Sequence, residues 1–220
     1  MLLTAIVRRF DQLISKAEND IRQTFLESLA VAQVEAPGDE ASRGGLRFRG
    51  SAQAATGIAP VQALPTTAAQ WFFYNPQSNR VTAWVDTLGC ELTGGTAGAG
   101  ITSLYFTMAG PANVPTTVQN ASKSGVVIQN ANPISSKGAS ALSLNSGVTL
   151  AGTNTWFPIA EGAGASTPVV GQAACVTRNI DGKIMIPPGC GLGLAIIAPS
   201  GTSPLYAPFI EWREYLADLE

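Results

Sequence analysis

The feature that most constrains the fold is a series of short apolar segments, separated by Gly/Pro-rich turns, that begins near Trp71. Some of these segments alternate apolar and polar residues, as VTAWVDTL does at 81–88, and a period of two is typical of a half-buried β-strand. About eight to ten such strands, with no helical period between them, predict an antiparallel β-sandwich or barrel. A jelly roll is the form that protects the edges of eight strands.

The first 36 residues follow a different period. Their apolar residues recur in steps of three and four, which predicts one long amphipathic α-helix. Two interpretations stay open: the apolar stripe packs on the chain's own β domain, or it packs on another protein or on symmetry copies. We take the second as the expectation. The stripe residues expected at a partner or oligomer interface are Leu3, Ile6, Phe10, Leu13, Ala17, Ile21 and Phe25.

Residues 37–68 are rich in Gly and Pro and predict a linker or an extended arm between the helix and a β domain at 69–220. Pro60 and Pro65 restrict ladder pairing in this arm to sheet edges. The segment LRFRG at 46–50 alternates apolar and charged residues, so it could form a short edge strand.

Two local patterns stand out in the last fifty residues. Asp181-Gly182 lies between β-prone flanks and predicts a type I′ hairpin turn. In the final segment, alternation separates two faces of one strand. Phe209, Glu211, Arg213 and Tyr215 face one way, and Ile210, Trp212 and Glu214 face the other.

Charge and composition restrict the partners. Only 13% of the residues are charged, against an ordinary share of about 25%, and the formal net charge is −2. No basic field exists to attract nucleic acid. The one cationic cluster, Arg43, Arg47 and Arg49, is more typical of a solvated loop or a partner contact. No apolar run approaches the length of a membrane span, so we expect a soluble protein without a membrane partner.

Catalytic chemistry is poorly represented. The absence of histidine excludes Ser-His-Asp and Cys-His nucleophiles and the common His-based metal sites. Three widely spaced cysteines fit neither a disulfide framework nor a metal knuckle, and indicate free thiols in a reducing cytoplasm. We therefore expect no enzyme, no catalytic or metal-binding residues and no cofactor. The enzymatic alternative is a glycan-degrading activity that uses Asp86, Glu91 or Glu161.

The four tryptophans are distributed one per predicted strand, at Trp71, Trp84, Trp156 and Trp212. This distribution is typical of core or interface packing. The alternative is an exposed aromatic face that binds a receptor or a carbohydrate.

The segment GKIMIPPGCGLGLAIIAPSGTSPLYAPFIEWREYL at 182–216 resembles the closing strands of bacteriophage virion jelly-roll proteins. In that family an I-x-I-P-P-G turn leads into an apolar strand, then a Gly-Thr hairpin, then a last strand that ends in W-x-E. The matching residues here are Ile184, Ile186, Pro187, Pro188, Gly189, Gly201, Thr202, Trp212 and Glu214.

This resemblance implies a trimeric jelly roll that belongs to a virion and is assembled in the host cytoplasm. The short chain, its single helix and the lack of a fibre-like repeat favour a capsid cement or decoration protein. Its partner would be the major capsid protein or another virion protein. The alternative is a tail or head-fibre jelly roll that binds a receptor and is attached by its N-terminal helix.

Overall fold

The structure is a computed structural model that describes residues 41–42, 44–52, 57–119, 126–135, 140, 142–163 and 175–216. The chain divides into two compact units, residues 1–42 and 43–220. The predicted helix and its stripe residues from Leu3 to Phe25 lie outside the described residues. Within the described part of the chain, no helix is long and apolar enough to cross a membrane.

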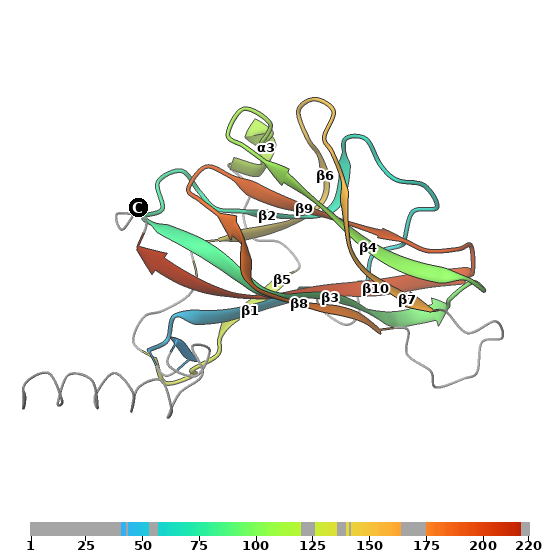
Figure 1. Ribbon diagram of the computed structural model, residues 1–220, viewed down its shortest axis with the longest axis horizontal. Coiled ribbons are helices and arrows are strands. Elements are labelled where there is room, and N and C mark those ends of the chain that lie inside the picture. Colours follow the sequence, from blue (N-terminus) through green and yellow to red (C-terminus); the bar gives the residue numbers. More distant parts are fainter. Residues whose placement is uncertain are drawn as a thin grey trace, which may run out of the picture. The chain divides into compact units, whose positions relative to one another are not determined.

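The second unit consists of two antiparallel β-sheets of five strands each, which form two layers in Figure 1. The predicted β-sandwich is therefore confirmed. Sheet A has the strand order β5-β1-β10-β3-β8, and sheet B has the order β6-β2-β9-β4-β7. The described residues of the second unit include the short helix α3 (Thr116–Gln119). The strands are β1 (Arg47–Ala52), β2 (Ala68–Tyr74), β3 (Val81–Thr96), β4 (Ile101–Ala109), β5 (Val126–Asn130), β6 (Ser143–Thr149), β7 (Phe157–Ala163), β8 (Cys175–Ile186), β9 (Gly191–Ile197) and β10 (Thr202–Leu216).

The strand pairs are nested along the chain. β2 pairs with β9, β3 with β8, and β4 with β7. Each successive pair is thus formed by strands that are closer together in the chain. The innermost strands depart from this order, because β5 pairs with β1 and β6 pairs with β2. The last strand, β10, lies between β1 and β3, and its ladder with β3 is the longest among the described strands.

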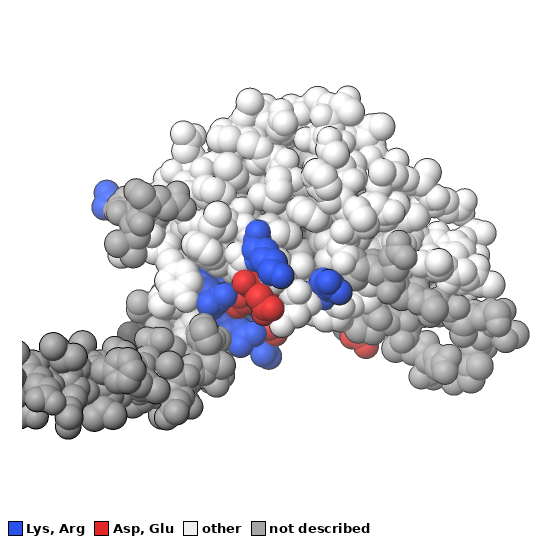
Figure 2. Space-filling model, viewed as in Figure 1, with Lys and Arg blue, Asp and Glu red and all other residues white. Residues whose placement is uncertain are grey.

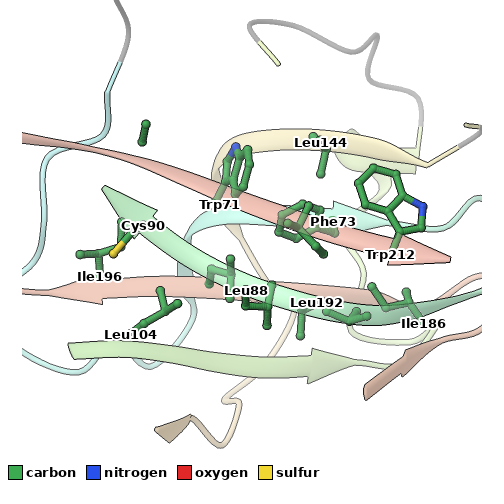
Figure 3. Close-up of a cluster of buried hydrophobic side chains, with 14 of the residues drawn as sticks. Trp71, Phe73, Leu88, Cys90, Leu104, Leu144, Ile186, Leu192, Ile196 and Trp212 are labelled. Carbon is green, nitrogen blue, oxygen red and sulfur yellow. The ribbon is translucent and has the colours of Figure 1, made fainter. Parts of the chain in front are cut away.

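The main hydrophobic core fills the space between the two sheets, and Figure 3 shows part of it. Trp71 and Phe73 of β2 pack edge to face there, with ring centroids 4.6 Å apart. Trp212 of β10 stacks on Phe48 of β1 at 5.8 Å. Burying one such side chain contributes about 1.5–3 kcal/mol, so these alternating apolar positions account for the sandwich.

A second apolar cluster lies on the other side of sheet B. Phe72 belongs to this cluster, whereas its neighbours along β2, Trp71 and Phe73, belong to the main core. Phe72 is nevertheless fully buried, because the segment that carries α3 and the β6–β7 connection cover it. Glycines on β9 make this possible: a Cβ added to Gly191 would come within 2.1 Å of Cζ of Phe72. Trp156, from the β6–β7 connection, lies over Gly193 in the same way, with Cη2 3.5 Å from an added Cβ.

Asn75 joins both sheets at the end of β2. Its side chain is fully buried, and Nδ2 donates hydrogen bonds to the carbonyl oxygens of Val81 and Ile186, each at 2.8 Å. Its Oδ1 accepts a hydrogen bond from Nδ2 of Asn79 at 2.8 Å. The backbone of Asn75 also bonds to the turn that precedes β9. One side chain thus links the end of β2, the start of β3 and the end of β8.

The hairpin predicted at Asp181-Gly182 is wrong, although its backbone geometry is right. Both residues have positive φ, 52° and 74°, as a type I′ turn requires. The flanking segments, however, do not pair with each other. Both pair with β3, through Asn179 opposite Thr87 and Ile184 opposite Val85, so the turn is a bulge within β8.

The segment at 46–50 does form a strand, but the predicted edge position is wrong. β1 pairs with β10 on one side and with β5 on the other. Beyond β1, the described part of the arm is hydrogen-bonded to both sheets. Ile58 exchanges two backbone hydrogen bonds with Tyr206 of β10. Val61 forms backbone hydrogen bonds with Ile196 of β9 and with Ala198, which follows β9.

Candidate functional site

Charged side chains gather on sheet A. The strands β2, β4, β6 and β9 of sheet B contain no Lys, Arg, Asp or Glu. In Figure 2 most of the blue and red side chains lie together in one area, and the described surface around them is mainly white. We give the name charged cluster to the residues of sheet A that ion pairs connect: Arg47 and Arg49 from β1, Asp86 from β3, and Glu211 and Arg213 from β10.

Asp86 and Arg213 form the best-packed ion pair of the charged cluster. Nε of Arg213 donates to both carboxylate oxygens of Asp86, at 2.9 and 3.0 Å, and Nη2 donates to Oδ1 at 2.7 Å. The side chain of Arg213 is only 15% exposed and that of Asp86 only 9%. Such a fork of charge-assisted hydrogen bonds fixes both groups in one geometry.

Glu211 is held by the two arginines of β1. Its Oε2 accepts from Nη2 of Arg47 at 2.8 Å, and its Oε1 lies 2.8 Å from Nε of Arg49. Nε of Arg47 is also 3.9 Å from Oδ2 of Asp86, which connects the two ion pairs. The charged cluster therefore contains three cations and two anions in one connected arrangement.

The fold builds the charged cluster through strand register and bulges. Arg49 lies opposite Glu211, and Arg47 lies opposite Arg213. Asp86 is an extra residue in β3, because the register with β10 shifts between Glu211 and its neighbour. The pairing of β3 with β8 shifts at the same place. A bulge re-aims a side chain, and here it leaves Asp86 on the same face as Arg213.

Aromatic side chains border the charged cluster. Trp84 and Tyr215 pack edge to face with ring centroids 6.3 Å apart, and the guanidinium carbon of Arg213 lies 6.0 Å from the centroid of Tyr215. The β8 bulge closes over them: a Cβ on Gly182 would come 3.1 Å from Nη2 of Arg213 and 3.3 Å from Cε3 of Trp84.

The environment of Arg213 stabilises its charged form. Burial by itself lowers the pKa of the guanidinium, but the hydrogen bonds and the negative charge of Asp86, with a contribution from Tyr215, raise that pKa above its ordinary value. Arg213 is consequently a permanent cation that holds Asp86 in place.

The opposite face of β10 carries a buried carboxylate. Nε1 of Trp212 donates to Oε1 of Glu214 at 2.9 Å, and the hydroxyl of Ser140 donates to the same oxygen. Glu214 is only 8% exposed. The predicted division of the last strand into two faces is confirmed, with Trp212 and Glu214 inward and Glu211 and Arg213 in the charged cluster.

Asp86 and Glu91, considered as a pair for glycan hydrolysis, do not converge. Asp86 and Glu91 both lie on β3, and five residues of an extended strand span about 16 Å. Glycosidase carboxyl groups stand less than about 10 Å apart. Glu161 is on β7 of sheet B, opposite Ser103 of β4. Within the described part of the chain, no three His, Cys, Asp or Glu side chains are grouped as metal ligands would be.

The tryptophans and arginines noted in the sequence take different positions in the fold. Trp71, Trp156 and Trp212 are buried, as the core interpretation predicted, and Trp84 is half-buried beside the charged cluster. Of the three arginines predicted to face solvent or a partner, Arg47 and Arg49 are in ion pairs, and Arg43 lies outside the described residues. The charged cluster itself was not predicted. The alternation in RFR at 47–49 and EWR at 211–213 was the available signal, but it does not show which strands are neighbours.

Comparison with known proteins gives little guidance. No protein-family model and no curated protein sequence matches the chain. Among solved structures, a chain from turnip yellow mosaic virus is similar over 78% of this chain and 81% of its own length, with 11% sequence identity and a TM-score of 0.24. A similarity at this level defines neither the fold nor the function.

Proposed function

We propose that the protein is a structural component of a virion, namely a capsid cement or decoration protein that binds and stabilises a bacteriophage capsid as a homotrimer. The observation that carries the proposal is the nested pairing of β2 with β9, β3 with β8 and β4 with β7. Nested antiparallel pairs are what a rolled-up ribbon of strands produces, and the resulting jelly roll is a common scaffold of viral capsid proteins.

The geometry of the closing segment supports the same proposal. The W-x-E element of the virion resemblance is a physical unit here, since Trp212 donates its indole N–H to the buried carboxylate of Glu214. The turn at Pro187–Gly189 is bonded to the buried Asn75, because N of Gly189 donates to the backbone O of Asn75 at 2.8 Å. Both elements of the motif therefore fix how the last strands meet the rest of the sandwich.

A cement protein stabilises a shell because it binds only the assembled state, so its binding free energy adds to the stability of that state. A trimer that engages several capsomers gains further retention from multivalency. We assign the attachment to the predicted helix at 1–36, and we place the sandwich at the surface of the particle.

The first test is to locate the protein on particles. Tagged full-length protein, supplied during phage production, should sediment with purified particles and with tail-less heads, in hundreds of copies per shell. A few tens of copies, confined to vertices or the tail, would instead favour the fibre alternative. Absence from particles of either kind would refute a virion role.

The second test addresses attachment. The double substitution Phe10→Asp with Leu13→Asp should abolish binding to particles and leave the sandwich folded, because it places charge on the apolar stripe. The matched control is Gln12→Asp with Ser15→Asp, which adds the same charge to the polar face of the same helix. Loss of the folded sandwich in the stripe variant would mean that the stripe packs on the chain's own domain.

A further inference from the structure

A shallow groove lies next to the charged cluster, on the outer face of sheet A. It has a volume of about 330 Å³ and crosses the neighbouring strands β5, β1 and β10. This volume is at the small end of the range for ligand sites, about 300–1,000 Å³. Its outward-facing lining residues are Arg49, Ser51, Gln129, Phe209 and Glu211.

The strand register arranges these residues in two rows. Gln129, Arg49 and Glu211 are opposite one another on three adjacent strands and form one polar row. Ser51 and Phe209 are opposite each other and form a second row, two residues further along the strands. Rows two residues apart are separated by about 7 Å, and neighbouring strands by about 5 Å. The groove floor therefore has a polar side and an aromatic side, at the scale of a small ring.

The polar row is held in place before any ligand arrives. Glu211 is fixed by Arg47 and Arg49, each at 2.8 Å. Arg49 uses Nε for this contact, and its side chain is 63% exposed and lines the groove. A guanidinium has further N–H donors on its two Nη atoms. The exposed Gln129 adds an amide donor and acceptor beside them. Pre-oriented planar groups lose little entropy when they bind.

The aromatic side is equally fixed. The ring of Phe209 lies over Gly89 of β3, where an added Cβ would come only 2.3 Å from Cζ of Phe209. Because a glycine is present, the ring packs against the backbone of the sheet and remains half-buried at the groove. It offers an apolar surface directly beside the polar row.

From this arrangement we infer that the groove binds a neutral hexose at the end of a glycan. A hexose has one face of C–H groups, which packs on an aromatic ring, and a rim of hydroxyl groups, which pair with planar donors and acceptors. The lining contains one cation and one anion in contact with each other, so it has no net charge to favour a phosphate or a carboxylate. On a virion, such a groove would bind a glycan-coated surface. The inference of hexose binding does not depend on the virion role.

The test uses the full-length protein and a panel of methyl glycosides of galactose, glucose, mannose and N-acetylglucosamine. Saturation-transfer NMR should detect at least one of them at millimolar concentration, with the strongest transfer to the ring C–H protons that face Phe209. Arg49→Ala and Gln129→Ala should each weaken binding by at least fivefold. Arg178→Ala, which removes an exposed arginine of sheet A outside the groove, should leave it unchanged.

Several outcomes would overturn the inference. These are no transfer to any of the four sugars, or equal binding by both groove variants and wild type. Thermal unfolding of each variant establishes that it is folded, and Gln129→Ala removes only an exposed side chain. Attachment to particles should be the same for the groove variants and wild type, so the sugar test and the virion test can fail separately.

Discussion

Replacing Asn75 with alanine tests whether one buried amide joins the two sheets. The change removes Nδ2, which donates to the carbonyl oxygens of Val81 and Ile186, and it removes the acceptor used by Asn79. The bond to Ile186 is buried, and the bond to Val81 is partly buried. Neither carbonyl oxygen would have its amide donor after the change.

The magnitude follows from those two carbonyls. A buried polar group left without its partner costs about 1–3 kcal/mol. Two such groups should lower the free energy of unfolding by about 2–5 kcal/mol, a large part of the 5–15 kcal/mol that is typical of a domain. Asn75→Asp should cost at least as much, because it keeps the shape of the side chain but removes both donors.

The assay is equilibrium unfolding in urea, followed by the fluorescence of the buried Trp71 and Trp212. Asn79→Ala is the matched control, since it removes one bond to Asn75 and leaves both of its donors in place; it should cost about 1 kcal/mol. The reasoning is refuted if Asn75→Ala is no more than about 1 kcal/mol less stable than Asn79→Ala.

Three other measurements test separate parts of the structure. A double-mutant cycle with Asp86→Ala and Arg213→Ala should give a coupling free energy of about 1–3 kcal/mol, and a value near zero would mean that the ion pair is solvated. Gly191→Ala should lower the free energy of unfolding by about 1–3 kcal/mol, because the new methyl group overpacks against Phe72. The control Gly110→Ala, where an added Cβ has nothing within 4 Å, should have a free energy of unfolding within about 1 kcal/mol of wild type. Equal stability of the two variants would contradict this. Burial raises the pKa of the Cys190 thiol above its ordinary value of 9.0, so its stabilising contribution is present below pH 9 and is lost as the pH rises through the raised pKa. Cys190→Ala should therefore lose less stability than wild type between pH 9 and 11, and parallel curves would refute the assignment.

The fold could be predicted where alternation is regular. The two faces of β10 follow directly from the period of two between Phe209 and Tyr215, and Trp212 and Glu214 do share the inner face. The strand β3 was predicted to end at Leu88, but it continues to Thr96. The glycines between residues 89 and 96 made this part of the strand look like a loop in the sequence. Gly89 is needed under Phe209, and a glycine-rich sequence by itself favours a loop.

The charged cluster could not be predicted, for a topological reason. Its members come from three strands that are distant in the chain, and the order of those strands depends on pairing that no local pattern encodes. The bulge at Asp86 adds a second difficulty, because a one-residue shift changes which face a side chain occupies. Asp181-Gly182 shows the same limitation: the local signal fixed the backbone angles, but the neighbouring strand β3 determined what the flanks pair with.

The position of β1 has a mechanical consequence. Its Arg47–Ala52 backbone is paired on both sides, with β10 and with β5. Ladder hydrogen bonds run perpendicular to the strands, so a pull transmitted along the chain into β1 loads two rows of bonds in shear at the same time. An edge strand pulled in the same direction would load only one row of bonds. A sandwich tethered through its N-terminal segment thus receives tension at a strand that resists extraction.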